Sequence, residues 1–356
     1  HPSRVKYIEN DKLMDFYPEV PESRRQDLTP AAYVRNGSIY ATTMSSFLEH
    51  KIRLGPDTRP YIMEESRTIN IDEPIDLELA KLQIKALLKS KKYDTIFTNP
   101  NKQNFMLDEE MLSQSGISII CTASTGLNHI DLDYCKKNSI KTLSITKDYV
   151  ILDKITSTAE HSFGLMMAII RNIPKSFDAV KAGEWDWEKY LGRQIDHLTI
   201  GIVGLGRLGK MMARYCQAFG AEILVYDPYV TKSGHQHVDS LADLFKLSDV
   251  VSLHVHVSDE TKHFINKGVL QKTGKSPYLI NTSRGEIVNE GDVIGALENG
   301  QLAGYATDVV EDEFGDLKSS QIIRRCKDLN IIVTPHVGGM CKEAREIAYN
   351  AVIDKL

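Results

Sequence analysis

The sequence predicts an α/β fold built on a doubly wound parallel sheet. Two observations carry this prediction: strand-like and helix-like stretches alternate from residue 76 onward, and a glycine-rich turn directly follows one of the strands. Helices that join successive parallel strands cover both faces of a sheet, so its strands are apolar throughout. No tandem repeat or low-complexity tract interrupts the alternation.

The composition limits the classes of protein that the chain can represent. Its 356 residues suffice for two or three domains, and 42% hydrophobic with 26% charged residues exclude disorder over most of the length. A formal net charge of −5 offers no basic surface to nucleic acid. No apolar run approaches the roughly 20 residues of a membrane span. We therefore expect neither nucleic acid nor a membrane as a partner.

The five cysteines predict a reducing compartment. Their number is odd, they are scattered, and none stands in CxxC spacing: Cys121, Cys135, Cys216, Cys326 and Cys341. Such cysteines indicate free thiols in the cytoplasm, without a structural zinc or other metal site. The chain begins with His1 and shows no signal-peptide pattern, so we expect that an upstream part of the protein is missing.

Apolar spacing places the expected elements in order. Residues 1–55 are polar and irregular, and the first helix is expected over 76–90. The stretch 157–171 is apolar nearly all round, which predicts a buried helix that crosses between domains. Further helices are expected over 131–137, 208–219, 240–246 and about ten residues after Glu290. Strands are expected over 95–98, 117–122, 140–145, 199–204, 223–227, 250–254, 278–281, 304–307 and 331–334.

A phosphate-binding turn is predicted after the strand over 199–204. Gly204, Gly206 and Gly209 stand in GxGxxG spacing between this strand and an amphipathic helix. The first glycine allows the tight turn, the second lets the backbone approach a pyrophosphate, and the third lets the helix pack on the strand. Asp227 ends the next strand, where a carboxylate binds ribose hydroxyls and repels a 2′-phosphate. The arrangement predicts NAD, rather than NADP, as the cofactor.

Three further strand ends carry polar residues that a buried sheet would not otherwise contain. Arg284 follows one strand, Glu313 ends the acidic run after the next, and His336 lies between a proline and two glycines after the third. The carboxyl ends of strands in such a sheet face one crevice. Arginine binds a planar carboxylate through two hydrogen bonds, and a histidine beside a glutamate exchanges a hydroxyl proton. The set predicts reduction of a 2-keto acid.

From about residue 94 to 356 the chain resembles the D-isomer-specific 2-hydroxyacid dehydrogenases. The motifs that carry the resemblance are TASTGLNHIDL (122–132), STAEH (157–161), GLGRLG (204–209), VSLHV (251–255), NTSRGEIVN (281–289), AGYATDVVEDE (303–313) and TPHVGG (334–339). The resemblance implies that Arg284 binds the carboxylate and keto oxygen of the substrate, Glu313 pairs with His336, and His336 is the acid/base group. It also implies a homodimer that acts on a small 2-keto or 2-hydroxy acid.

The resemblance assigns the remaining site residues as well. Backbone at Thr125 and Gly126 is expected to hold the substrate carboxylate. Ser124 departs from the family pattern, because glycine is common there. No basic residue occurs near 99–101, where phosphoglycerate enzymes keep an arginine, which argues against 3-phosphoglycerate as the substrate. The NAD site is expected to comprise Gly204, Gly206, Arg207, Leu208, Gly209, Asp227, His254, Thr282 and Asp308, with Asp308 near the nicotinamide amide.

Residues 15–88 resemble a different family, the C-terminal third of the CMP-sugar synthetases (acylneuraminate and related cytidylyltransferases). The shared motifs are RRQD (24–27), NGSIY (36–40) and INID (69–72) with Asp76. In that family paired aspartates hold magnesium; here Asn70 replaces the first, Asp72 keeps the second, and the CTP-binding front is absent. We expect a transferase remnant fused to a dehydrogenase, with a divergent extension as the alternative.

These observations predict three domains. Residues 1–88 form the cytidylyltransferase-like remnant, 162–325 the NAD-binding Rossmann domain, and 89–161 with 326–356 the smaller flavodoxin-like substrate domain into which it is inserted. The predicted function is NAD-dependent interconversion of a 2-keto acid and its D-2-hydroxy acid. Two alternatives stay open: an NADH-sensing regulatory protein, which needs no proton donor, and a nucleotidyltransferase whose active front lies outside this chain.

Overall fold

The computed structural model describes residues 6–9, 12–15, 74–98, 106–230, 232–311, 313, 315 and 317–356. The chain divides into two units, His1–Lys89 and Ser90–Leu356. In the first unit, β1 (Lys6–Glu9) and β2 (Lys12–Asp15) pair antiparallel, and α2 spans Pro74–Lys89. The RRQD, NGSIY and INID motifs lie outside the described residues, and so do residues 99–101.

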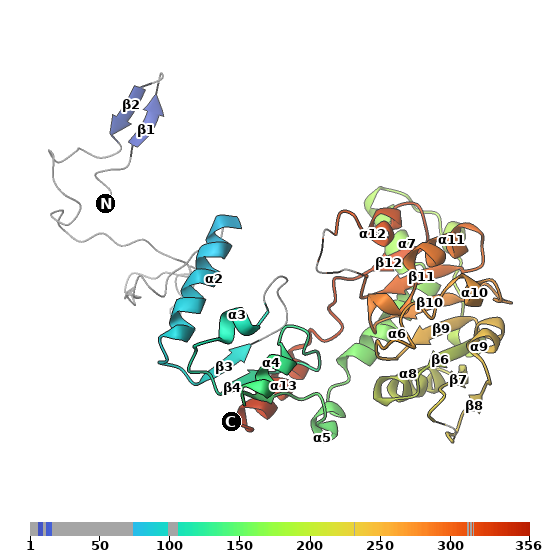
Figure 1. The fold of residues 1–356 in the computed structure, drawn as a ribbon. Coiled ribbons are helices and arrows are strands. Elements are labelled where there is room, and N and C mark those ends of the chain that lie inside the picture. The colour runs from blue at the N-terminus through green and yellow to red at the C-terminus, as the bar shows by residue number, and fades with distance from the viewer. Residues whose placement is uncertain are drawn as a thin grey trace, which may run out of the picture. The chain divides into compact units, whose positions relative to one another are not determined.

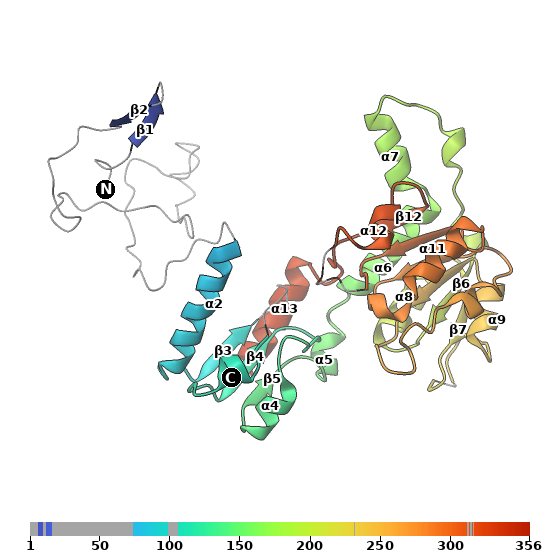
Figure 2. The ribbon, with the colours of Figure 1, turned by 45° about the horizontal axis from the view of Figure 1, so that its top comes forward.

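The second unit contains a three-stranded parallel sheet in the order β3-β4-β5, of which Figure 1 labels β3 and β4 and Figure 2 labels all three strands. Ala348 and Val352 of a helix at the end of the chain share one hydrophobic core with Cys121 and Leu143 of this sheet (Figure 2). The strands are β3 (Thr95–Thr98), β4 (Ile119–Thr122) and β5 (Lys141–Leu143), and the helices are α3 (Glu109–Leu112), α4 (Leu132–Lys137), α5 (Tyr149–Leu152) and the terminal α13 (Lys342–Ile353).

A seven-stranded parallel sheet forms the larger part of the second unit. Its order is β12-β11-β10-β9-β6-β7-β8, so the chain runs outward from β6 first to one edge and then to the other. This is the doubly wound arrangement that the alternation predicted. The strands are β6 (Thr199–Val203), β7 (Glu222–Tyr226), β8 (Gln236–His237), β9 (Val250–Leu253), β10 (Tyr278–Asn281), β11 (Gly304–Thr307) and β12 (Ile331–Val333).

Helices cover both faces of the large sheet. Because side chains alternate along a strand, Leu279 and Tyr305 join the core on one face, whereas Ile280 and Ala306 join the core on the other. The first face carries α9 (Leu241–Leu247), α10 (Lys267–Leu270), α11 (Glu290–Glu298) and α12 (Gln321–Arg325), and the second carries α6 (Ser157–Ile170) and α8 (Arg207–Ala218). The burial expected for the apolar stretch 157–171 is confirmed, since seven residues of α6 are buried.

The structure extends the large sheet beyond the expected domain boundary at 325. β12 pairs with β11, with Val333 opposite Thr307. The helix–strand alternation continues through α12, so the sheet gains one more strand before the chain returns in α13. The other elements are α7 (Ile173–Lys181) and the short 3₁₀ turns η4 (Glu188–Tyr190), η5 (Ile195–His197) and η6 (Gly285–Ile287). In the part of the chain that the structure describes, none of the helices has the length and apolarity to cross a membrane.

Asp249 connects three segments at the amino ends of the strands. Its Oδ2 accepts a hydrogen bond from the backbone N–H of Thr199 at 3.0 Å, and its carboxylate pairs with Arg193 and Lys275, each at 3.1 Å. The side chain is only 8% exposed. Burial raises the pKa of Asp249, but these hydrogen bonds and the Lys275 charge outweigh it and hold the pKa below its usual value.

Replacement of this carboxylate, Asp249→Asn, is expected to lower the free energy of unfolding by about 1–3 kcal/mol at pH 7, because an amide cannot accept from all three donors. A depressed folded-state pKa stabilises the protein above the unfolded value near 3.9, and the stabilisation disappears as pH falls through the folded value. Urea titrations of the wild type and the variant should therefore differ at pH 7 and converge in acid. Asp178→Asn, at a side chain that is 70% exposed, is the control. Equal stability of Asp249→Asn and wild type at pH 7 would contradict the assignment.

Candidate active site

The expected site residues follow strands that end at one level. The parallel register places Asn281 opposite Thr307, Thr307 opposite Val333, and Val203 opposite Leu253. The next residue along each strand therefore reaches the same edge of the sheet. The residues at this edge are Gly204, His254, Thr282, Asp308 and Thr334.

The glycine turn after β6 has the geometry that a pyrophosphate requires. Gly204 has φ +85°, and a Cβ there would lie 2.6 Å from the carbonyl oxygen of His254. A Cβ on Gly209 would lie 2.0 Å from the carbonyl oxygen of Gly204, so the helix start packs directly on the turn. Gly206, the N-cap of α8, has no side-chain cap, and a Cβ there would meet no described atom within 4 Å. The backbone N–H groups in the first turn of α8 suit an anion, so the residues of this glycine turn fit the phosphates of a dinucleotide.

Asp227 stands beside this turn at the end of β7. Its Oδ2 accepts from Leu205 N at 2.7 Å, and its Oδ1 accepts from Tyr229 N at 2.8 Å and Val230 N at 3.1 Å. Three backbone donors hold the carboxylate in place; both lone pairs of Oδ1 are occupied, and Oδ2 keeps one lone pair for a ribose hydroxyl. A fixed negative charge here opposes a second anion.

The side chain of Arg207 binds backbone near the start of α6 instead of lining the NAD site as expected. Its Nη1 donates to the carbonyl oxygens of Leu152, the last residue of α5, at 2.7 Å and of Ile155, in the loop before α6, at 2.6 Å. Burial lowers the pKa of the guanidinium, but arginine stays charged at neutral pH. The expectation that Arg207 lines the NAD site therefore applies to its backbone. Leu208, next along the helix, is half-buried.

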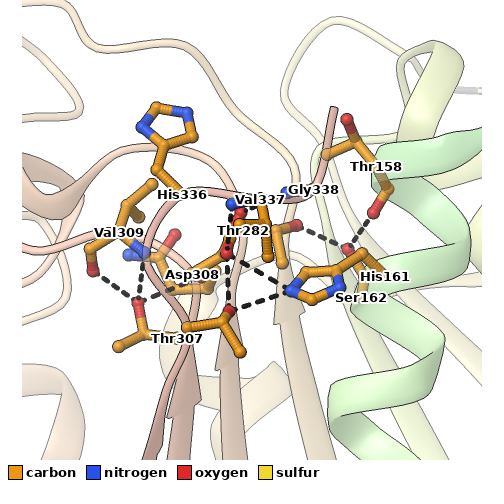
Figure 3. A network of polar contacts seen from close by, with 12 residues as sticks. Thr158, His161, Ser162, Thr282, Thr307, Asp308, Val309, His336, Val337 and Gly338 are labelled. Carbon is orange, nitrogen blue, oxygen red and sulfur yellow. Dashed lines mark hydrogen bonds and ion pairs between the residues drawn. The ribbon is translucent and has the colours of Figure 1, made fainter. Parts of the chain in front are cut away.

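Two residues of the expected NAD site contact hydroxyl groups. The Nε2 atom of His254 lies 2.9 Å from Ser252 Oγ, and burial lowers the pKa of His254 to about 4, so the imidazole is neutral near pH 7. Thr282 Oγ1 lies 2.5 Å from Ser162 Oγ of α6. The Ser162 hydroxyl donates to the carbonyl oxygen of Thr158, so the Thr282 hydroxyl donates to Ser162. The contact between Thr282 and Ser162 joins the sheet edge to α6 (Figure 3).

His336 and Glu313 form the pair that the family resemblance implied. His336 Nδ1 lies 2.9 and 3.0 Å from the two carboxylate oxygens of Glu313. The hydrogen bond to Glu313 raises the pKa of His336, against the opposing effects of burial and the Arg284 charge, and the Asp308 charge adds to the rise. The side chain of His336 is 46% exposed, and its ring points away from the Asp308 carboxylate (Figure 3). Nε2 is thus the atom that can exchange a proton with a ligand.

Arg284 lies between this pair and the small sheet. Asn281, buried at the end of β10, accepts from Ser283 N at 3.0 Å and donates to the Arg284 carbonyl oxygen at 2.9 Å, which shapes the turn. Arg284 Nη1 donates to the Ser283 carbonyl oxygen at 2.7 Å. Arg284 Nη2 lies 3.5 Å from the position of a Cβ on Gly126. The structure therefore brings the guanidinium to the turn that was expected to hold the carboxylate.

That turn carries an additional contact. Gly126 N donates to Ser124 Oγ at 3.0 Å, and the hydroxyl of Thr146 donates to the Thr125 carbonyl oxygen at 3.2 Å. The N–H of Gly126 is therefore occupied by Ser124, the residue that departs from the family's glycine. A ligand carboxylate at this turn competes with the Ser124 hydroxyl for that N–H.

Sequence reasoning missed the residues that support the pair. His263 Nε2 lies 2.9 Å from Glu311 Oε1, and Glu311 N donates to Glu290 Oε1 at 2.8 Å, two contacts that hold the acidic run carrying Glu313. His161 of α6 contacts Asp308. The histidine of the STAEH motif was the available signal. No three metal-ligating side chains converge among the residues whose positions the structure describes.

Comparison with known proteins agrees with this geometry. The family model described as "D-isomer specific 2-hydroxyacid dehydrogenase, NAD binding domain" matches residues 163–338. D-3-phosphoglycerate dehydrogenase of Bacillus subtilis is 33% identical over 236 residues, which cover 65% of this chain and 43% of that protein. The chain thus spans less than half the length of the curated phosphoglycerate dehydrogenases that it matches. Glyoxylate reductase of Thermofilum pendens is 33% identical over 250 residues, 67% of this chain and 71% of that protein.

Solved structures show the same fold and cofactor. D-lactate dehydrogenase of Aquifex aeolicus, solved with NAD and lactic acid, is 33% identical with a TM-score of 0.63, over 76% of this chain and 84% of that one. D-lactate dehydrogenase of Escherichia coli is 26% identical with a TM-score of 0.67, over 77% of this chain and 84% of that one. The larger sheet is therefore the core of an NAD-binding domain, and the chain belongs to the D-isomer-specific 2-hydroxyacid dehydrogenase family.

Proposed function

We propose that this protein interconverts a small 2-keto acid and its D-2-hydroxy acid with NAD. The observation that carries the proposal is the His336–Glu313 pair, which lies with Arg284 at the edge of the sheet that also bears the glycine turn. The pair supplies a proton donor and acceptor, and the guanidinium supplies a carboxylate partner. NAD, when bound, supplies or accepts the hydride.

In the proposed reaction the chain binds the acid, holds it and moves one proton. Arg284 binds the carboxylate and the keto oxygen, and the backbone of Thr125 and Gly126 holds the other side of the carboxylate. His336 donates its Nε2 proton as negative charge develops on the keto oxygen, and takes a proton from the hydroxyl in the reverse direction. Glu313 stabilises the imidazolium. Ser124 yields the Gly126 N–H when the carboxylate arrives.

The NAD contacts are proposed on the geometry of the turn. Backbone N–H groups of Gly206, Arg207 and Leu208 bind the pyrophosphate at the start of α8, and Asp227 binds the adenine ribose. The remaining residues of the proposed site are Gly204 and Gly209, which shape the turn, and His254, Thr282 and Asp308, which face the nicotinamide half.

The pairing of β12 moves the proposed domain boundary. We assign 162–338 to the NAD-binding domain and 89–161 with 339–356 to the substrate domain, because β12 belongs to the large sheet. All five cysteines are free. Free thiols support the reducing cytoplasm as the location.

The resemblance of residues 15–88 to CMP-sugar synthetases supports a second activity, nucleotidyl transfer, in a bifunctional protein. The motifs that carry this resemblance are INID with Asp76 and RRQD. Incubation of the full-length protein with CTP, magnesium and a sugar acid tests it through release of pyrophosphate. The dehydrogenase proposal does not depend on the outcome.

We also propose that a second copy of the chain covers an exposed apolar arm formed by α7 and the loop to residue 191. None of the residues of α7 is buried, and both tryptophans of the chain lie on the arm. Figure 2 shows α7 and this loop extending beyond the large sheet. The exposed fractions are 53% for Ile173, 63% for Phe177, 51% for Val180, 79% for Trp185, 75% for Trp187 and 88% for Leu191. Several large apolar side chains exposed on one short segment are typical of an interface, which supports the homodimer that the resemblance implied.

Replacing the proton donor tests the function. NADH oxidation should be screened with pyruvate, glyoxylate and hydroxypyruvate, and His336→Ala should lower kcat by about 10²–10⁴ with the substrate that works best. Because Glu313 raises the pKa of His336, imidazolium is populated near neutrality, and reduction should fall as pH rises through the raised value. Glu313→Gln should shift that fall to lower pH. His197→Ala, at an exposed histidine, is the control. NADH binding without turnover of any acid would favour the sensing alternative instead.

Cofactor choice tests the assignment of Asp227. NADPH should give a kcat/KM at least about tenfold below that of NADH, because the fixed carboxylate repels a 2′-phosphate. Asp227→Asn should raise KM for NADH and narrow the ratio. Glu222→Gln, at the opposite end of the same strand, should leave both values unchanged. Equal kcat/KM for the two cofactors in the wild type would overturn the assignment.

The apolar arm can be tested by fluorescence, because both tryptophans of the chain lie on it. In a dimer closed by the arm, Trp185 and Trp187 leave water, so tryptophan emission should shift to the red on dilution below the dissociation constant. Light scattering should give twice the chain mass for the wild type and the chain mass for Trp185→Ser with Trp187→Ser. Tyr229→Ser, 83% exposed elsewhere, should stay dimeric. A monomeric wild type at all concentrations would refute the proposal.

A further inference from the structure

The turn that carries His336 has an unusual backbone conformation. His336 has φ +53°, in the left-handed region that a residue with a Cβ rarely adopts. Its N–H lies 2.9 Å from the carbonyl oxygens of both Asp308 and Thr334. Such a conformation persists only where surrounding contacts hold it. The contacts that hold this turn therefore also set the direction of the imidazole.

A single buried carboxylate supplies most of those contacts. Asp308 Oδ1 accepts from the Thr334 hydroxyl at 2.5 Å and from Val337 N at 2.9 Å, and its Oδ2 accepts from Gly338 N at 2.7 Å (Figure 3). The Asp308 side chain is 2% exposed. It thus binds the chain on both sides of His336, two residues before it and one and two residues after it.

His161 reaches this carboxylate from α6, on the other side of the turn. Its Nε2 lies 2.9 Å from Thr334 Oγ1 and 3.3 Å from Asp308 Oδ1. The hydroxyl hydrogen of Thr334 is given to Asp308, so Thr334 can only accept from the imidazole, and His161 Nε2 must carry the hydrogen. The His161 ring also lies against the turn, since its Cδ2 is 3.7 Å from the position of a Cβ on Gly338.

We propose that His161 is a positioning residue: by donating from Nε2 to Thr334 and Asp308, it holds the turn on which His336 meets Glu313. The proposal rests on the proposed function only in taking His336 as the acid/base group. His336 Nδ1 must stay within hydrogen-bond distance of Glu313 for imidazolium to be stabilised. A turn that loses its support lets the ring rotate away from that carboxylate.

Two neutral replacements separate the hydrogen bond from the charge of His161. Glutamine places an amide N–H close to the position of Nε2, whereas leucine keeps the bulk and donates nothing. Titration of the His336 ring by NMR, without substrate, should show a lower pKa in His161→Leu than in His161→Gln. The charged groups facing His336, which are Glu313, Arg284 and Asp308, are the same in both variants.

The kinetics of keto-acid reduction should also differ between His161→Leu and His161→Gln. His161→Leu should lower kcat for keto-acid reduction roughly 10- to 100-fold relative to His161→Gln, as expected for a displaced catalytic group, with the NADH dissociation constant within about twofold. The fall of reduction with rising pH should begin at lower pH in His161→Leu. His197→Leu, at a side chain that is 75% exposed, is the matched control and should behave as wild type.

A lower melting temperature for His161→Leu, with the His336 titration unchanged relative to His161→Gln, would overturn the proposal and leave His161 a purely structural role. Should His161→Leu fail to fold, Thr334→Val removes the bridging hydroxyl at nearly constant volume, and an unchanged His336 titration there would equally refute it. Wild-type protein that reduces no keto acid would end the proposed function, while the NMR titration would still decide the role of His161.

Discussion

The candidate site depends on one constraint, which is that the parallel strands of the large sheet end at the same level. Because Val203, Leu253, Asn281, Thr307 and Val333 are held in one register, the chain leaves five neighbouring positions at the same edge of the sheet. Each strand then needs only one or two further residues to deliver a functional group. A shift of one residue in any ladder would turn the following side chain to the opposite face and remove it from the site.

Two histidines near this edge of the sheet differ in pKa because their surroundings differ. Burial with only the Ser252 hydroxyl as a partner lowers the pKa of His254 to about 4, which suits a neutral wall of a cofactor site. His336 is more exposed and meets the carboxylate of Glu313, which raises its pKa. The pKa of the same side chain is thus lowered at one position and raised at the other, and the Glu313 carboxylate makes the difference.

Much of this arrangement was predictable because buried parallel strands are apolar runs that end in Gly, Asn or Asp. The expected strands agree with those of the structure to within two residues, and the resemblance of the motifs to the dehydrogenase family implied the pairing of Glu313 with His336. Other features depend on contacts that local sequence does not encode. β8 has only two residues, and it is a strand because it pairs with β7 at the edge of the sheet. The His161–Thr334 contact joins residues 173 positions apart. Ile173, Phe177 and Val180 of α7 have the spacing of a stripe that faces a core, yet all three are exposed.

The contacts of Arg207 join the first turn of α8 to the end of α5 and the loop that follows it. Its backbone begins the helix whose first turn faces the phosphate site, while its guanidinium binds the carbonyl oxygens of Leu152 and Ile155, in the segment through which the substrate domain connects to α6. A rotation about that segment must either carry the first turn of α8 with it or break both hydrogen bonds. If such a rotation changes the free energy of NAD binding, then NAD binding must change the free energy of the rotation by the same amount. If α8 binds the dinucleotide as proposed, this one side chain couples that binding to the position of Leu152 and Ile155.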